Sequence, residues 1–194
     1  MDDLCPRIIE IVRKKGYQRL SAPIELASGE LSHDYIDGKR AFAVGADLKL
    51  ACEGFLAVAR ETSIDFDAVG GLTLGADQFA HGVALLSERA WFVVRKEIKH
   101  HGTKKKIEGA DLKPGVKVLL VDDVVTSGGS ILEALEEIRK TGAEVVLAVT
   151  LVDRGEVARE CFRAEGIPYR ALVTYRDLGI EPVGLGQGSA QAAG

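Results

Sequence analysis

The stretch KVLLVDDVVTSGGS, residues 117–130, decides how the rest of the chain is interpreted. Its apolar residues 118–121 predict a strand buried on both faces, and Asp122 and Asp123 follow where that strand is expected to end. The small residues 126–130 then lead into a predicted helix. Glycines, free backbone amides and the positive end of a helix dipole favour a phosphate ligand. Because two carboxylates cannot bind phosphate, they predict a second partner: sugar hydroxyls, Mg²⁺, or both.

Each part of this stretch also has an ordinary structural explanation. An aspartate at the end of a strand often caps the next helix, and Ser/Gly loops are common connections. The phosphate-binding patterns G-x-x-x-x-G-K-[ST] and G-x-G-x-x-G do not occur within residues 117–130. The whole combination nevertheless indicates a phosphorylated sugar bound at the end of a central strand.

The composition predicts a globular protein of the cytoplasm. A length of 194 residues, 46% of them hydrophobic and 28% charged, fits one α/β domain with a substantial core. The formal charge of −4 argues against a dedicated nucleic-acid binder. Three cysteines without C-x-x-C spacing predict reduced thiols. The charged N-terminus does not resemble a signal peptide, and no apolar run is long enough to span a membrane.

Strands and helices are expected to alternate along most of the chain, which predicts an α/β fold with a central, mostly parallel sheet flanked by helices. Residues 1–182 are expected to form one domain, with a small N-terminal hood over about 17–40, and residues 183–194 a disordered tail. The periodicity predicts helices over 3–15, 46–61, 75–88, 130–141 and 155–165, and strands over 67–71, 91–94, 118–121, 144–152 and 168–174.

Four other segments carry residues that suggest a ligand. Residues 28–39 are compatible either with a base-binding hood or with a plain surface hairpin. The glycine turn 70–75 is compatible either with a second anion site or with simple helix–strand packing. The run 95–106 is rich in Arg, Lys and His, and its length and Gly102 favour a mobile lid over an anion rather than a solvated loop. Arg154 follows a predicted strand and is expected either to clamp a carboxylate or to pair with Asp153.

The segment 117–130 strongly resembles the phosphoribosyl-diphosphate (PRPP) motif of type I phosphoribosyltransferases. Other segments resemble the members of that family that act on orotate: the hood Ser28-Gly29…Ser32-x-x-Tyr35-x-Asp37, the loop Val69–Asp77, the lid Arg95-Lys96-x-x-Lys99-x-His101-Gly102 with Ile107-Glu108-Gly109, and Asp153-Arg154. The resemblance covers nearly the whole chain except the tail.

The resemblance implies transfer of a phosphoribosyl group from PRPP to N1 of orotate, which yields orotidine 5′-monophosphate and pyrophosphate in pyrimidine (UMP) synthesis. It implies Mg²⁺, held mainly through PRPP and water rather than directly by protein, and a homodimer whose lid acts in the neighbouring subunit's site. No nucleic acid or membrane partner is expected. The implied orotate contacts are Thr126, Arg154, Tyr35 and Ile36, and the implied pyrophosphate loop comprises Gly71, Leu72, Thr73, Leu74 and Gly75.

The resemblance also assigns PRPP contacts and catalytic groups. Lys99 and His101 are the expected catalytic residues, although His100 could serve as well on spacing alone. Asp122 and Asp123 are implied to hold the ribose hydroxyls. The implied PRPP-binding residues are Arg95, Lys96, Lys99, His101, Asp122, Asp123, Val124, Val125, Thr126, Ser127, Gly128, Gly129 and Ser130.

Two positions depart from the pattern, because Ala27 and Leu74 stand where many members of the family have lysines. Their absence leaves recognition of the orotate carboxylate to Arg154 and the hood backbone, and more of the pyrophosphate charge to Mg²⁺ and the lid. The alternatives are a phosphoribosyltransferase for another base, a PRPP-sensing regulator on the same fold, and a basic-loop nucleic-acid binder.

Overall fold

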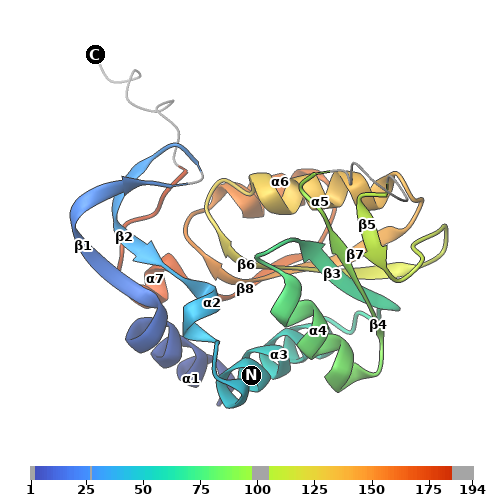
Figure 1. Cartoon of the computed structure of the whole chain (residues 1–194), viewed down its shortest axis with the longest axis horizontal. Coiled ribbons are helices and arrows are strands. Elements are labelled where there is room, and N and C mark those ends of the chain that lie inside the picture. Colours follow the sequence, from blue (N-terminus) through green and yellow to red (C-terminus); the bar gives the residue numbers. More distant parts are fainter. Residues whose placement is uncertain (1–2, 27, 98–104, 185–194) are drawn as a thin grey trace.

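The computed structural model describes residues 3–26, 28–97 and 105–184, and its centre is a six-stranded sheet in the order β5-β4-β3-β6-β7-β8 (Figure 1). All neighbouring strands are parallel except the edge strand β5, which runs antiparallel to β4. The expected α/β class with a mostly parallel sheet is therefore confirmed. The strands are β3 (Ala68–Leu72), β4 (Ala90–Val94), β5 (Ile107–Gly109), β6 (Lys117–Val125), β7 (Glu144–Asp153) and β8 (Tyr169–Thr174).

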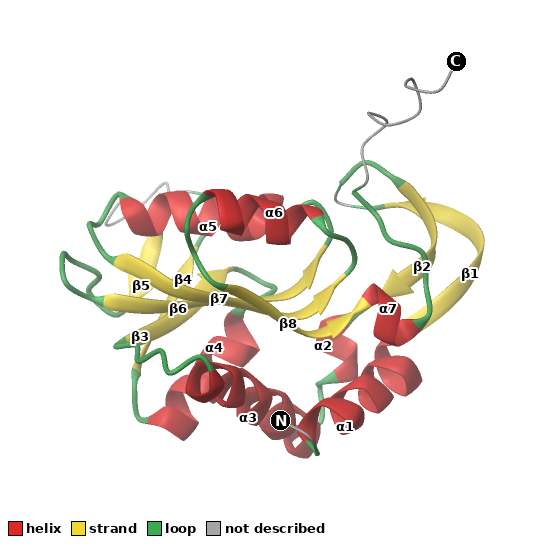
Figure 2. Cartoon of the chain, turned by 180° about the vertical axis from the view of Figure 1, so that it is seen from behind, coloured by secondary structure: helices red, strands yellow, loops and turns green. Residues whose placement is uncertain are grey.

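Helices cover both faces of this sheet and bury two hydrophobic cores (Figures 1 and 2). Successive residues of β6 alternate between them: Leu119 and Val121 pack in one core, and Val118 and Leu120 in the other, all four fully buried. This is the two-faced burial that the apolar run predicts. The helices are α1 (Leu4–Ile11), α3 (Gly45–Glu61) and α4 (Asp77–Ser87) on one face, and α5 (Gly129–Arg139) and α6 (Val157–Ala164) on the other.

Several element boundaries differ from the sequence prediction. The strand β6 continues through the acidic pair to Val125, because its main chain pairs with β7 as far as Val125 opposite Asp153. The predicted first helix changes at Val12 into a π-helical segment, η1 (Val12–Gly16). The sequence prediction also missed β5, which has only three residues and lies at the end of the basic run.

The N-terminal hood is a separate two-stranded hairpin, formed by β1 (Tyr17–Glu25) and β2 (Leu31–Ile36). It stands at the β8 end of the molecule, and the short helix α2 (Gly38–Ala41) connects it to the core (Figure 2). Near the C-terminus, α7 (Tyr175–Leu178) follows β8. Val183, the first residue of the predicted tail, is buried and donates its N–H to the carbonyl of Arg154 at 2.9 Å.

The strand order creates a crevice at the carboxyl edge of the sheet. From β3 the chain turns outward to β4, and from the adjacent β6 it turns in the opposite direction to β7. Loops at such a switch point diverge, so ligands of open α/β sheets bind there. Three features meet at this position: the glycine turn after β3, the acidic pair of β6, and the Gly/Ser-rich loop that follows β6. In the described part of the chain, no helix is long and apolar enough to cross a membrane.

Candidate active site

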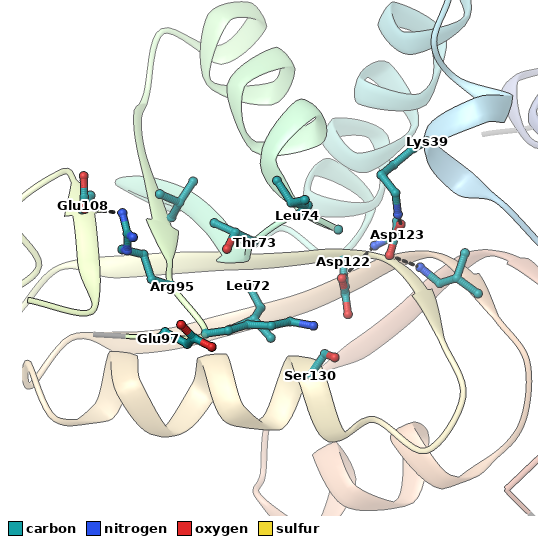
Figure 3. A pocket seen from close by; sticks show the side chains of 14 residues that line it. Lys39, Leu72, Thr73, Leu74, Arg95, Glu97, Glu108, Asp122, Asp123 and Ser130 are labelled. Atoms are coloured by element: carbon teal, nitrogen blue, oxygen red, sulfur yellow. Dashed lines mark hydrogen bonds and ion pairs between the residues drawn. The ribbon is translucent and has the colours of Figure 1, made fainter. Parts of the chain in front are cut away.

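A cavity of about 770 Å³ opens at this switch point (Figure 3). Its volume falls in the usual range for small-molecule sites. Its walls come from α2, from the carboxyl ends of β3, β4 and β6, and from the first turn of α5. The lining residues are Lys39, Leu72, Thr73, Leu74, Gly75, Val93, Arg95, Lys96, Glu97, Glu108, Asp122, Asp123, Val124 and Ser130.

The acidic pair forms the floor of the cavity and is held in place by hydrogen bonds. Asp122 Oδ1 accepts the N–H of Asp123 at 3.0 Å, and Asp123 Oδ1 accepts the N–H of Val124 at 2.7 Å. Asp123 Oδ2 lies 3.1 Å from the ammonium group of Lys39. Burial, reinforced by repulsion from Asp123, raises the pKa of Asp122 to about 7. The pair therefore presents one fixed acceptor and one carboxyl that is partly protonated near neutral pH.

The segment after the acidic pair encloses a smaller hollow of about 70 Å³. It shares Asp122, Val124 and Ser130 with the large cavity, so the two are neighbours. Gly128 has a φ of +82°, a conformation that favours glycine, and α5 begins at the next residue. The hollow thus lies at the N-terminus of an 11-residue helix, where backbone N–H groups and the helix dipole favour an anion. It is lined by Asp122, Val124, Val125, Thr126, Ser127, Gly128, Gly129 and Ser130.

The glycine turn after β3 lies directly against the acidic pair. A Cβ atom at Gly75 would come within 2.7 Å of a side-chain oxygen of both Asp122 and Asp123, and one at Gly71 would lie 2.1 Å from the carbonyl oxygen of Val121. Both positions therefore require glycine for close approach. The Thr73–Leu74 peptide is cis, and the Leu74 side chain is 75% exposed. Residues 72–75 line one wall of the cavity.

Cations lie beside this turn, at the end of β4, because the Thr73 N–H donates to the carbonyl of Val94 at 2.8 Å. Arg95 donates from Nη1 to Glu108 Oε1 at 3.1 Å, which ties the start of the basic run to β5. Lys96 also lines the cavity and is close enough to lower the pKa of Asp122, though less than burial raises it. Lys99, His100 and His101 lie outside the described residues. Of the predicted lid, the structure therefore places Arg95 and Lys96 at the site.

Arg154 connects the core to the hood rather than pairing with its neighbour. Its guanidinium donates to the carbonyl of Asp34 at 2.8 Å and to the hydroxyl of Ser32 at 3.3 Å. Asp153 instead accepts from the Tyr169 hydroxyl and the Gly155 N–H, both at 3.0 Å, so the expected Asp153–Arg154 pairing is wrong. Arg154 is 1% exposed, and its Nε has no hydrogen-bond partner in the structure. A buried, unsatisfied donor of this kind favours an acceptor on a ligand.

The other predicted base contacts lie at the hood and the phosphate loop, and none of them lines the large cavity in the described part of the chain. Thr126 lies in the smaller hollow. Tyr35 is half-buried and lies close enough to Lys39 to raise the pKa of the Lys39 ammonium group. The side chain of Ile36 is 6% exposed and packs in the core, so only its main chain is available to a ligand.

Sequence reasoning missed three charged residues near the site. Lys39 contacts Asp123 from α2, and Asp34 accepts from Tyr17 Oη at 2.8 Å and from Arg19 at 2.7 Å within the hood. Asp77 Oδ2 is buried with no hydrogen-bond partner, and burial raises the pKa of this carboxyl. All three lie within segments quoted for other reasons. The partners of Lys39 and Asp34 are distant in sequence, so no local pattern signals these contacts.

Comparisons with known proteins agree with this geometry. A profile of the phosphoribosyl transferase domain matches residues 45–160. An orotate phosphoribosyltransferase of Corynebacterium glutamicum is 45% identical over 159 residues, which cover 81% of this chain and 85% of the relative. The orotate phosphoribosyltransferase of Mycobacterium tuberculosis, solved in complex with PRPP, is 32% identical with a TM-score of 0.74, over 91% of this chain and 99% of that one. The orotate phosphoribosyltransferase of Aeropyrum pernix is 31% identical with a TM-score of 0.76, over 88% of this chain and 95% of that one.

The fold, the acidic pair and the phosphate-type loop, together with these matches, define a phosphoribosyltransferase, and the chain belongs to that family of pentosyltransferases. Within the family, it belongs with the orotate phosphoribosyltransferases, to which it is similar over most of its length in both sequence and structure.

Proposed function

We propose that the chain catalyses the reaction orotate + PRPP ⇌ orotidine 5′-monophosphate + pyrophosphate. The observation that carries this proposal is the switch-point cavity, where the acidic pair, an anion-type loop at a helix N-terminus and the cations after β4 face one space. PRPP carries the complementary groups: ribose hydroxyls, a 5′-phosphate and a diphosphate. The similarity to the Mycobacterium tuberculosis enzyme that was solved with PRPP supports this arrangement.

In this proposal, each part of PRPP has its own contact. Asp122 and Asp123 accept the ribose hydroxyls, and the backbone amides of residues 124–130 bind the 5′-phosphate, with Thr126 at the end nearest the base. Because the 71–75 main chain lies against the acidic pair, it runs beside the anomeric carbon and binds the diphosphate. The sugar is thus held between the two loops.

The chemical step is displacement at the anomeric carbon, through a transition state with oxocarbenium character. Orotate N1 attacks while the carbon–oxygen bond to pyrophosphate breaks, so negative charge accumulates on the leaving group. Arg95 and Lys96 border that position, and Lys99 and His101 are proposed to complete the charge stabilisation and to supply a proton. Closing these groups over the diphosphate would exclude water and so prevent hydrolysis of PRPP.

The acidic pair also fits a role beside Mg²⁺. In the described part of the chain, no three Asp, Glu, His or Cys side chains come together in a manner that could hold a metal. Asp122 and Asp123 would therefore supply at most part of a coordination shell, and the diphosphate and water would supply the remainder. The bound ion would neutralise charge that develops on pyrophosphate.

For orotate, the free Nε of Arg154 is the main recognition group. Its two other nitrogens donate to Asp34 and Ser32 of the hood, so the guanidinium plane is fixed and Nε is the donor left for a ligand. The main chain at Tyr35 and Ile36 closes the base site from the hood. This arrangement favours an acidic pyrimidine over uracil or a purine.

A homodimer with lids exchanged between subunits is part of the proposal. Three large apolar side chains are exposed: Leu74 at the cavity, Leu85 on α4 and Trp91 on β4, with exposed fractions of 75%, 81% and 42%. The ring of His81 packs edge-on against Trp91 with centroids 4.5 Å apart. A second copy that covers these side chains, Leu74 included, would lie beside the cavity and would bring its own lid close to it. Cys52 and Cys161 form no disulfide in the described part of the chain, which fits a cytoplasmic protein.

Loss of orotate absorbance on addition of PRPP and Mg²⁺ tests the proposal. We expect turnover with orotate, little with uracil, adenine or hypoxanthine, and none without Mg²⁺. Turnover confined to another base would replace the orotate assignment. Tight PRPP binding without turnover of any base would instead indicate the regulator alternative.

A further inference from the structure

Lys39 makes a cross-element contact with the acidic pair that the reaction scheme does not use. Its ammonium group lies 3.1 Å from Asp123 Oδ2, although the two residues are 84 positions apart. In Figure 3, the Lys39 side chain points to Asp123 from the wall opposite Ser130. Arg95, in contrast, is engaged with Glu108. Lys39 thus contacts the ribose side of the cavity rather than the lid side.

The base of this side chain is anchored firmly. A Cβ atom at Gly38 would lie 3.2 Å from Asp123 Cβ and 3.4 Å from Leu151, so α2 packs directly on the sheet beside the acidic pair. The side chain of Asp37 caps the helix by accepting the N–H of Arg40 at 2.9 Å. The packing places the Lys39 main chain one side chain's length from Asp123, so its ammonium group reaches the carboxylate at the edge of the cavity.

Lys39 also provides a positive charge to several carboxyl groups around it. Burial alone would lower the pKa of Lys39, but Asp123, with Asp37 and Tyr35, raises it above its ordinary value. In return, Lys39 opposes the burial and repulsion that raise the pKa of Asp122 and of Asp77. Four carboxyl groups, those of Asp37, Asp77, Asp122 and Asp123, therefore share this lysine as a counter-charge.

The contact completes the fixation of Asp123. Its Oδ1 accepts the N–H of Val124 and its Oδ2 accepts Lys39, so both ends of the carboxylate are fixed while acceptor lone pairs remain free. We infer that Lys39 is a positioning residue that holds Asp123 as the oriented acceptor for the ribose of PRPP. The inference rests on the proposed function, because it assumes that PRPP is the ligand.

Calorimetric titration of the full chain with PRPP and Mg²⁺, without orotate, tests this role. Losing one charge-assisted hydrogen bond predicts about tenfold weaker PRPP binding in Lys39→Met, whereas Lys39→Arg stays near wild type because it keeps the donor. The matched control is Arg40→Met, which removes an exposed cation from the same helix and leaves PRPP affinity unchanged. Unliganded melting temperatures verify that all three variants are folded.

A double-mutant cycle separates positioning from direct contact. If Lys39 acts through Asp123, then Lys39→Met weakens PRPP binding far less in an Asp123→Asn background than in wild type. Wild-type affinity in folded Lys39→Met, or full additivity in the cycle, would overturn the inference. Absence of PRPP binding by the wild-type protein would refute the proposed function itself, so the two failures are distinguishable.

Discussion

The buried carboxyl of Asp122 should make the unliganded protein less stable as the pH rises. Its pKa is about 7 in the folded chain, against about 3.9 in an unfolded chain. The folded state therefore binds the extra proton, and its stability falls as the pH rises from about 4 to about 7 and then levels off. The difference of about three pH units corresponds to roughly 4 kcal/mol at most.

Asp122→Asn removes this titration and isolates its effect. Between pH 5 and pH 7, wild type should lose about 2 kcal/mol of unfolding free energy relative to the variant, because the slope of about 1.4 kcal/mol per pH unit falls by half as the pH reaches the folded-state pKa. Urea unfolding from pH 5 to pH 8, without PRPP or Mg²⁺, measures this difference. Asp111→Asn, at an exposed carboxylate, controls for loss of one negative charge. If the unfolding free energies of wild type and Asp122→Asn change with pH in parallel, the reasoning is refuted. A constant difference in stability between the two proteins does not bear on it.

Three further predictions concern the proposed activity. Gly75→Ala should weaken PRPP binding at least tenfold in calorimetry, because the added methyl group displaces the Asp122 and Asp123 oxygens that lie 2.7 Å from its position. Unchanged affinity would contradict the close approach. Arg154→Met should raise the KM for orotate more than the KM for PRPP in steady-state kinetics, and an equal rise in both would argue against a role in base recognition. Lys99→Ala should lower kcat by about 10²–10³ with little change in PRPP affinity. Mixing Lys99→Ala subunits with Asp123→Asn subunits should restore activity if lids act across the dimer. A stable but inactive mixed dimer would exclude that arrangement.

The sequence predicted the sheet and the position of the site because those features depend on local pattern. Residues 118–121 are apolar without alternation, which is what a strand between two helical layers requires. The Gly/Ser segment and the acidic pair are contiguous, so their joint placement at a strand end follows from connectivity alone. The parallel sheet then brings the glycine turn after β3 to the same edge.

Features that depend on distant partners could not be predicted. The strand β6 extends through Asp122 and Asp123 because β7 continues to pair with it, which no property of the two aspartates indicates. Likewise, Arg154 reaches Asp34 across 120 positions, so its sequence neighbour was the only visible partner. Lys39 was quoted at the end of the hood segment, but its role follows from the packing of α2 on β6.

The central claim, that the crevice between β3 and β6 holds PRPP in one orientation, is tested most directly by a crystal structure with PRPP and Mg²⁺. We predict the 5′-phosphate in the hollow formed by residues 124–130, the ribose hydroxyls on Asp122 and Asp123, and the diphosphate along residues 71–75. PRPP bound elsewhere, or with its diphosphate in the 124–130 hollow, would contradict the account.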